Sequence, residues 1–177
     1  ECPLCQIQDN NEAQYVDNFL GGSVMEPAVR IEVNEKGFCT RHFKQLWDAK
    51  NRLGLALMAH TYLKRSMEKL EGQRFEKPSL FGKKTNGDGG ASEQVKQGCI
   101  LCERVSNTMW RYALTLCYMW KREPEFKRAM AESKGFCLPH YAELLRAAEK
   151  ELSGAPLAEF QQALKKTQMD NLARIEK

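Results

Sequence analysis

The sequence lacks the features of a membrane or secreted protein. It contains no run of about 18 apolar residues, which is the length that a membrane-spanning helix needs. No signal peptide is visible at its start. The chain opens at Glu1 without an initiator methionine, so we expect that it was trimmed and that residues preceded Glu1 in the native chain. From these absences we expect a cytoplasmic protein.

The sequence also lacks a β-sheet pattern and a recognisable catalytic set. No strand-like run of alternating apolar and polar residues occurs. No Ser-His-Asp, Cys-His-Asp or paired-carboxylate arrangement indicates an active site. The Gly-rich stretch 86–90 has no Lys-Ser/Thr pair, so it does not predict a phosphate loop. We therefore name no catalytic residue and favour a binding protein over an enzyme.

Charge of either sign is not in large excess. The formal net charge is +4, from 27 basic and 23 acidic residues, which neither requires nor excludes a nucleic-acid partner. Hydrophobic residues make up 42% of the chain, enough for a packed core. A basic cluster is interpreted as a solvated face, with nucleic acid as the alternative; it comprises Lys64, Arg65, Lys69, Arg74, Lys77, Lys83 and Lys84. We expect an unidentified macromolecular partner, with protein favoured over nucleic acid.

Cysteine, in contrast, is abundant and repeated. The chain has seven cysteines, an odd number that argues against a closed disulfide framework. Two motifs occur twice in the same order, a CxxC and a later GFCxxH. A Glu-Pro pair lies between them in each copy. The copies place Cys2-x-x-Cys5, Glu26-Pro27 and Cys39-x-x-His42 opposite Cys99-x-x-Cys102, Glu123-Pro124 and Cys137-x-x-His140. This internal repeat is the strongest signal in the sequence.

The repeat predicts an all-α fold built from a duplicated helical unit. We expect a first repeat over 1–71, a flexible linker over 72–97 and a second repeat over 98–177. The two repeats would pack as one globular domain, a helical bundle with pseudo-two-fold symmetry. Each repeat would hold one metal site.

Each repeat is predicted to contain three helices. The first would run over 5–20 in one copy and 102–122 in the other, where Val105, Met109, Tyr112, Ala113, Leu116 and Trp120 form an apolar stripe. Pro27 and Pro124 suit the first turn of a short second helix.

The ends of these pieces carry their own signals. Gly37 and Gly135 suit a left-handed position after the second helix, and Thr40 suits the N-cap of the third. That third helix would run long in copy one, past Leu57. In copy two it would break at 153–156, before a further helix from Pro156 to about Ile175.

The repeated cysteines and histidines are interpreted as metal ligands. Thiols two residues apart at a helix start can face one ion, and Cys and His three residues apart share one helix face. Three thiolates and one imidazole form the closed tetrahedral shell of structural zinc. The sequence predicts one zinc ion in each repeat, with iron–sulfur clusters, free thiols or disulfide-forming thiols as alternatives. The sets are Cys2, Cys5, Cys39 and His42, and Cys99, Cys102, Cys137 and His140.

Several residues outside these sets have separate interpretations. Cys117 is predicted to be a buried core thiol. His60 is interpreted as a hydrogen-bonded core histidine, with a functional role as the alternative. The CxxC at the start of the chain would fray, so we expect its metal site to be the more labile one.

Four strings resemble an uncharacterised bacterial family, catalogued as domain of unknown function 6062 and found mainly in anaerobic Firmicutes. They are Cys2-Pro3-Leu4-Cys5, Met25-Glu26-Pro27, the segment 34–42 and the segment 51–57. The resemblance covers essentially the whole chain and implies a bacterial cytoplasmic protein of unassigned activity, without catalytic residues. Within the segment 51–57, Gly54 is a candidate for a close helix contact, and Asn51 and Arg52 are candidates for a polar site near it.

The sequence is compatible with three candidate functions. The first is a non-enzymatic scaffold with two structural zinc sites that binds another macromolecule. The second is a thiol-based sensor or metal-handling protein, which the CxxC pairs at helix starts suggest. The third is an iron–sulfur protein.

Overall fold

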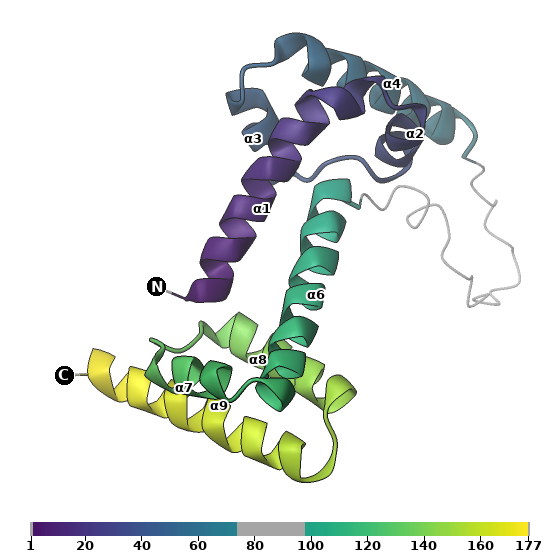
Figure 1. Cartoon of the computed structure of the whole chain (residues 1–177). Helices are drawn as coiled ribbons and strands as arrows, with labels where there is room; N and C mark the ends of the chain where they lie inside the picture. Colours follow the sequence, from purple (N-terminus) through teal and green to yellow (C-terminus); the bar gives the residue numbers. More distant parts are fainter. Residues whose placement is uncertain (1, 74–97, 177) are drawn as a thin grey trace, which may run out of the picture. The chain divides into compact units, whose positions relative to one another are not determined.

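The computed structural model describes residues 2–73 and 98–176, and every regular element in these ranges is a helix (Figure 1). The predicted all-α fold is confirmed. None of the described helices has the length and hydrophobicity needed to cross a membrane. The predicted linker lies almost entirely at 74–97, outside the described residues. The elements are α1 (Pro3–Leu20), the 3₁₀ helix η1 (Gly22–Met25), α2 (Pro27–Lys36), α3 (Thr40–Asp48), α4 (Arg52–Glu71), α6 (Ile100–Arg122), α7 (Pro124–Glu132), α8 (Leu138–Glu151) and α9 (Gly154–Ile175).

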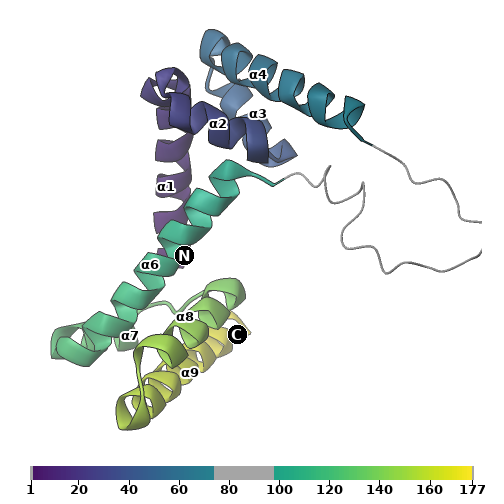
Figure 2. The same cartoon turned by 90° about the vertical axis from the view of Figure 1, so that its right-hand side faces the viewer.

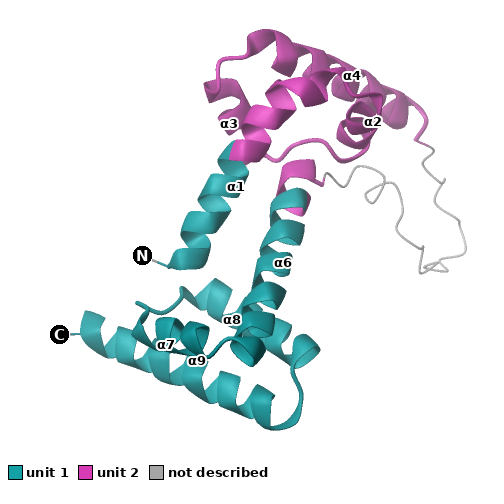
Figure 3. Ribbon diagram, viewed as in Figure 1, with its two compact units in different colours: residues 1–13, 104–177 teal, residues 14–103 magenta. Residues whose placement is uncertain are grey.

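The chain forms two compact units whose boundaries fall inside helices (Figure 3). Unit 1 consists of Glu1–Ala13 and Arg104–Lys177, and unit 2 consists of Gln14–Glu103. Both α1 and α6 therefore contribute one part to each unit. Each unit combines residues of both sequence repeats, whereas the sequence assigned each repeat its own segment. The pseudo-two-fold arrangement stays a prediction.

The core of unit 2 is built from α1, α2, α3 and α4. Phe19, Val33, Leu46 and Met58 have no exposed surface. α2 packs against α4 (Figure 2). The first residues of α6 join the same core, since Ile100 and Leu101 are buried in it.

Within unit 1, α6 contributes buried residues to the core. The predicted apolar face of α6 is buried at Val105, Met109, Ala113 and Trp120. Its prediction is wrong at Tyr112, whose side chain is 39% exposed. The Trp120 and Phe160 rings meet edge to face, with centroids 5.4 Å apart. α9 packs against both α7 and α8.

Cys117 lies in this core with no exposed surface, as predicted. Burial and the negative charge of Glu151 raise the pKa of its thiol to about 12. A thiol that stays protonated and inaccessible is unreactive. Cys117 is therefore a packing residue.

The predicted helix-start prolines are confirmed, and so is the positive φ of both glycines; Gly37 is the C-cap of α2, but α7 is capped by Ser133 and ends before Gly135. Pro27 and Pro124 are the first residues of α2 and α7. Gly37 and Gly135 have φ of 65° and 76°. A Cβ on Gly37 would lie 2.6 Å from the Tyr62 ring, so both backbone and packing require glycine there.

The long third helix predicted for copy one is wrong, because the chain breaks between α3 and α4. Lys50 has φ of 66°, which a helix cannot contain. Asn51 then caps α4: its Oδ1 accepts from the Gly54 N–H at 3.0 Å, and its Nδ2 donates to the Leu20 carbonyl at 2.6 Å. A Cβ on Gly54 would lie 3.0 Å from that same carbonyl, which confirms the predicted close contact.

Other helix starts also differ from the sequence analysis. Thr40 is the first residue of α3, and Cys39 is the N-cap, so the predicted Thr40 cap is wrong. α1 and α6 begin at Pro3 and Ile100, two residues earlier than predicted. α9 begins at Gly154 instead of Pro156. The earlier starts of α1 and α6 place Cys5 and Cys102 in the first turn of their helices.

The two hydrogen bonds of Asn51 make it a structural residue. Asn51→Ala should lower the free energy of unfolding by about 2 kcal/mol, because it removes a helix cap and the bond to Leu20 together. Asn18→Ala is the matched control, since Asn18 is exposed on α1, and it should change stability by less than about 0.5 kcal/mol. Thermal unfolding at fixed metal concentration measures both. Equal effects of the two substitutions would contradict this role.

Candidate metal centres

The eight repeated cysteines and histidines gather into two groups of four, and each group could hold a metal ion. Site 1 consists of Cys2, Cys5, Cys137 and His140, and site 2 consists of Cys39, His42, Cys99 and Cys102. Within each site the ligand-type atoms all lie within 4.8 Å of one another.

The grouping within each repeat, as predicted from the sequence, is wrong. The CxxC of each repeat lies beside the CxxH of the other repeat. The reason is the course of α1 and α6, which carry the start of one repeat into the unit that contains the rest of the other. All four residues of site 1 belong to unit 1, and all four of site 2 belong to unit 2.

All four ligand pairs occupy the same position in a helix. The first residue of each pair immediately precedes a helix, and the second is the third residue of that helix. Cys39 and Cys137 are N-caps with extended backbone, at ψ of 163° and 156°. Each site is therefore formed by two helix N-termini, where free N–H groups and the helix dipole favour negative charge.

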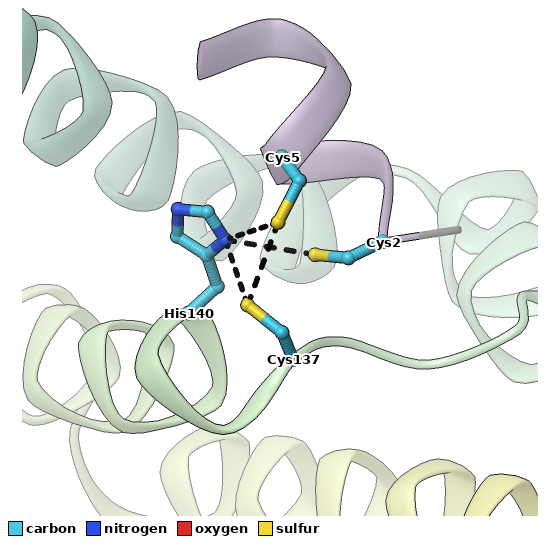
Figure 4. A group of neighbouring side chains, drawn as sticks. All are labelled: Cys2, Cys5, Cys137 and His140. Atoms are coloured by element: carbon cyan, nitrogen blue, oxygen red, sulfur yellow. Dashed lines mark hydrogen bonds between the residues drawn. The ribbon is translucent and has the colours of Figure 1, made fainter. Parts of the chain in front are cut away.

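Site 1 brings the start of α1 to the start of α8, with the four side chains pointing toward one another (Figure 4). The Nδ1 atom of His140 lies 3.6, 3.5 and 3.1 Å from the sulfurs of Cys2, Cys5 and Cys137. The sulfurs of Cys5 and Cys137 are 3.6 Å apart. His140 is buried, and the three cysteines are half-buried.

Site 2 brings the start of α3 to the start of α6. The Nδ1 atom of His42 lies 3.3, 3.2 and 3.3 Å from the sulfurs of Cys39, Cys99 and Cys102. The sulfurs of Cys39 and Cys102 are 3.8 Å apart. His42 has no exposed surface, but Cys102 is exposed, unlike any residue of site 1.

These distances suit four donors around one ion. A tetrahedral shell with metal–sulfur bonds of about 2.3 Å and metal–nitrogen bonds of about 2.0–2.1 Å separates its sulfurs by about 3.8 Å, and sulfur from nitrogen by about 3.6 Å. A disulfide would need a sulfur–sulfur distance of about 2.05 Å. All seven cysteines are free thiols, so the disulfide alternative has no support.

In each site, hydrogen bonds lower the pKa of one thiol that stands just before a helix of that site, Cys2 in site 1 and Cys39 in site 2. Burial opposes ionisation of Cys2, but N–H donors of Cys137, Cys5 and Leu4 outweigh it and lower its pKa. Burial likewise opposes ionisation of Cys39, and N–H donors of His42 and Arg41 help to lower its pKa.

One other thiol of each site resists ionisation while no cation is near. Burial comes first, then hydrogen bonds that the protonated Cys5 thiol makes to the neighbouring sulfurs, then repulsion from their charge; together they raise the pKa of Cys5 to about 12. The same causes, in the same order, raise the pKa of Cys102 to about 12. A divalent ion would displace these protons, so metal binding would release them.

The outer ring nitrogens of the two histidines have different neighbours. In site 1, Nε2 of His140 lies 3.0 Å from the side-chain oxygen Oε1 of Gln8. In site 2, Nε2 of His42 lies 3.4 Å from Nη2 of Arg41. When Nδ1 holds an ion, a neutral imidazole carries its proton on Nε2 and becomes a donor. The side-chain oxygen of Gln8 can accept a hydrogen bond from that N–H, whereas a guanidinium has no acceptor.

The remaining candidate residues lie away from both sites. His60 is exposed on α4, so its interpretation as a core histidine is wrong. Asn51 is the cap described above, and the Arg52 guanidinium lies over the Trp47 ring at 4.4 Å. The predicted polar site at Asn51 and Arg52 is therefore a set of structural contacts at the α3–α4 turn.

Sequence reasoning missed Gln8. Its signal was present, because Gln8 follows Cys5 by three residues and so shares a face of α1 with it. Nothing in that spacing indicated that a histidine more than 130 residues away would be its partner.

Comparisons with known proteins place the chain in a family without supplying a function. It is 23% identical over 156 residues to an uncharacterized 23.9 kDa protein in the xynA 3′ region of Caldicellulosiruptor sp. (strain Rt8B.4), a match that covers 85% of this chain and 71% of that protein. No solved structure matches. The model of a family of unknown function, DUF6062, matches residues 1–177. The chain therefore belongs to the DUF6062 family of unknown function.

Proposed function

We propose that this protein is an α-helical interaction module whose two units are each held together by one structural zinc ion. The observation that carries the proposal is the pair of Cys3His groups, each with its four donor atoms within 4.8 Å of one another. Thiolates and imidazole are the ligands of structural zinc, and four of them fill its shell. A filled shell leaves no position for a water or a substrate, which favours structure over hydrolytic catalysis.

The donor spacing favours a single ion over an iron–sulfur cluster. In a cluster the protein ligands bind different iron atoms, so their donor atoms lie farther apart than ligands of one ion. Sulfur–sulfur distances of 3.6 and 3.8 Å at sites 1 and 2 suit one shared ion. Zinc is the common ion for such a shell.

A structural role also follows from the energies involved. Structural zinc contributes about 10–16 kcal/mol of apparent binding free energy in small peptides. A whole domain is stable by only about 5–15 kcal/mol. Each site ties together residues distant in sequence, 132 positions apart for Cys5 and Cys137 and 63 apart for Cys39 and Cys102. The ions would therefore decide whether each unit keeps its fold.

The interaction surface in this proposal is the exposed apolar face of α4. It consists of Leu53, Leu57, Leu63, Met67 and Leu70, with exposures of 72, 38, 59, 60 and 52%. The face is opposite the buried residues of the same helix, Leu55 and Met58. Soluble proteins rarely expose apolar side chains in a continuous patch without a partner to cover it.

The spacing of this face indicates what would cover it. Its leucines and methionine recur at steps of three, four and six residues, with His60 completing the stripe. Such a near-heptad stripe packs against another helix. We therefore assign the α4 apolar face to an apolar helix of a protein partner.

The first test is metal content and its effect on folding. Protein purified without added metal should contain two zinc ions per chain by inductively coupled plasma mass spectrometry. Removal by a strong chelator should abolish the cooperative thermal transition, because both units lose the ion that holds their helix starts together. Metal-free protein that keeps an unchanged unfolding transition would contradict the structural role.

The second test concerns the α4 apolar face. The double variant Leu63→Glu, Met67→Glu should capture at least about 90% less partner from a nuclease-treated lysate than the wild type does. The reason is that each new charge opposes burial of the face in an interface. Both zinc ions and the helical content should be unchanged. Met169→Glu, a change at a residue 57% exposed on α9, is the matched control and should capture normally. Equal capture by both variants would reject this face.

A further inference from the structure

Cys102 differs from the other ligand residues of the two sites in its access to solvent. Among the eight ligand residues, all of which lie in the described part of the chain, Cys102 alone has an exposed side chain. Cys39 and Cys99 of the same site are half-buried, as are the three cysteines of site 1. A small dissolved reagent can therefore reach the Cys102 sulfur more easily than any other ligand sulfur.

The exposure of a sulfur decides how fast it meets an oxidant. A thiolate bound to a metal ion still carries lone pairs on sulfur, and cysteine oxidation follows thiolate character and exposure together. Metal binding makes all six ligand cysteines thiolates, so that exposure is what distinguishes them. Cys102 is therefore the sulfur that a peroxide would oxidise first.

A second thiolate lies close enough to Cys102 to complete the reaction. The Cys39 sulfur is 3.8 Å from the Cys102 sulfur. A disulfide needs about 2.05 Å between its sulfurs, so small rotations about the two Cα–Cβ bonds have to bring them together. Cys39 stands just before α3, and Cys102 is the third residue of α6. A disulfide between them would join the starts of these two helices.

We propose that site 2 is a peroxide-responsive zinc site, in which oxidation links Cys102 to Cys39 and releases the ion, while site 1 retains its ion. This inference rests on the proposed zinc sites and gives one of them a regulatory role. The oxidant is hydrogen peroxide or another hydroperoxide.

The reaction has two steps, and both balance. The Cys102 sulfur attacks one peroxide oxygen; its bond to the metal ion and the O–O bond break, and the departing hydroxide takes a proton to become water. The Cys39 thiolate then attacks the Cys102 sulfur; the S–S bond forms, the S–O bond breaks, and a second hydroxide takes a proton to become water. The two sulfurs lose two electrons, which the peroxide gains. The ion is left with Cys99 and His42, half of its shell.

Loss of this ion would act on the unit that carries the α4 apolar face. His42 is the third residue of α3, and α3 contacts α4 within unit 2. The disulfide keeps the starts of α3 and α6 joined, but His42 loses its bond to the ion. Site 1 has all four of its ligands in unit 1. Peroxide would therefore loosen α3 against α4 and leave unit 1 folded.

The test is a peroxide titration of the zinc-loaded full chain. Zinc content is measured before and after hydrogen peroxide is added, and mass spectrometry of unreduced peptides locates each oxidised sulfur. One zinc ion should be released several-fold faster than the other, together with a disulfide between Cys39 and Cys102 and no change at the cysteines of site 1.

Three results would overturn the inference. They are equal oxidation of both sites, earlier oxidation of site 1, and oxidation of Cys102 without a bond to Cys39. A chain that contains no zinc before peroxide is added would instead reject the proposed zinc sites, and the inference with them.

A substitution at Cys102 tests whether its sulfur is the cause. Cys102→His keeps a zinc donor at the exposed position but removes the sulfur, so site 2 should hold its ion and lose its response to peroxide. Asn107→His places the same side chain at another exposed position of α6 and should respond as the wild type does. A Cys102→His protein that holds both ions and still loses one of them several-fold faster would contradict the role of Cys102.

Hydrogen exchange measures the consequence for unit 2. After peroxide treatment, the amides of α3 and α4 should exchange faster, whereas those of α8 and α9 should be unchanged. A thiol reductant with added zinc should restore the original rates. Unchanged exchange in α3 and α4 would overturn the link between oxidation and the α4 apolar face.

Discussion

Two helix N-termini meet at each ligand group, and the rest of the structure depends on that meeting. Each terminus supplies one donor residue just before the helix and one in its first turn. Free N–H groups there stabilise the thiolates that an ion requires, and lower the pKa of Cys2 and Cys39. The starts of α1 and α8 meet at site 1, and the starts of α3 and α6 meet at site 2.

Because the CxxC of each repeat lies beside the CxxH of the other, α1 and α6 each take part in both units. α1 carries Cys5 in unit 1 and Phe19 in the core of unit 2, and α6 carries Cys102 in unit 2 and Trp120 in the core of unit 1. Each helix therefore belongs to one metal site at its start and to the other unit's core at its end.

The sequence predicted which residues are ligands, but not how they combine. A CxxC and a CxxH have the same helical geometry in either combination, so the spacing of Cys2, Cys5, Cys39 and His42 suited one site equally well. Tertiary packing decides which CxxC joins which CxxH. For example, Ile100 next to Cys99 is buried in the core of unit 2, and its N–H donates to the carbonyl of Gly37, near Cys39, at 3.1 Å. The break at Lys50 could not be predicted from the sequence either, because lysine rarely adopts the positive φ that it has here. Gly54, the two helix-start prolines and the buried Cys117 were predictable, because each carries a local signal.

The zinc content of two matched double variants tests the combination of ligands most directly. Cys5→Ser with His140→Ala removes two ligands of site 1, and Cys5→Ser with His42→Ala removes one ligand from each site. The first variant should retain one zinc ion per chain and the second should retain none, because serine and alanine do not replace these ligands. One ion in the second variant and none in the first would show that each repeat binds its own metal and would contradict the account.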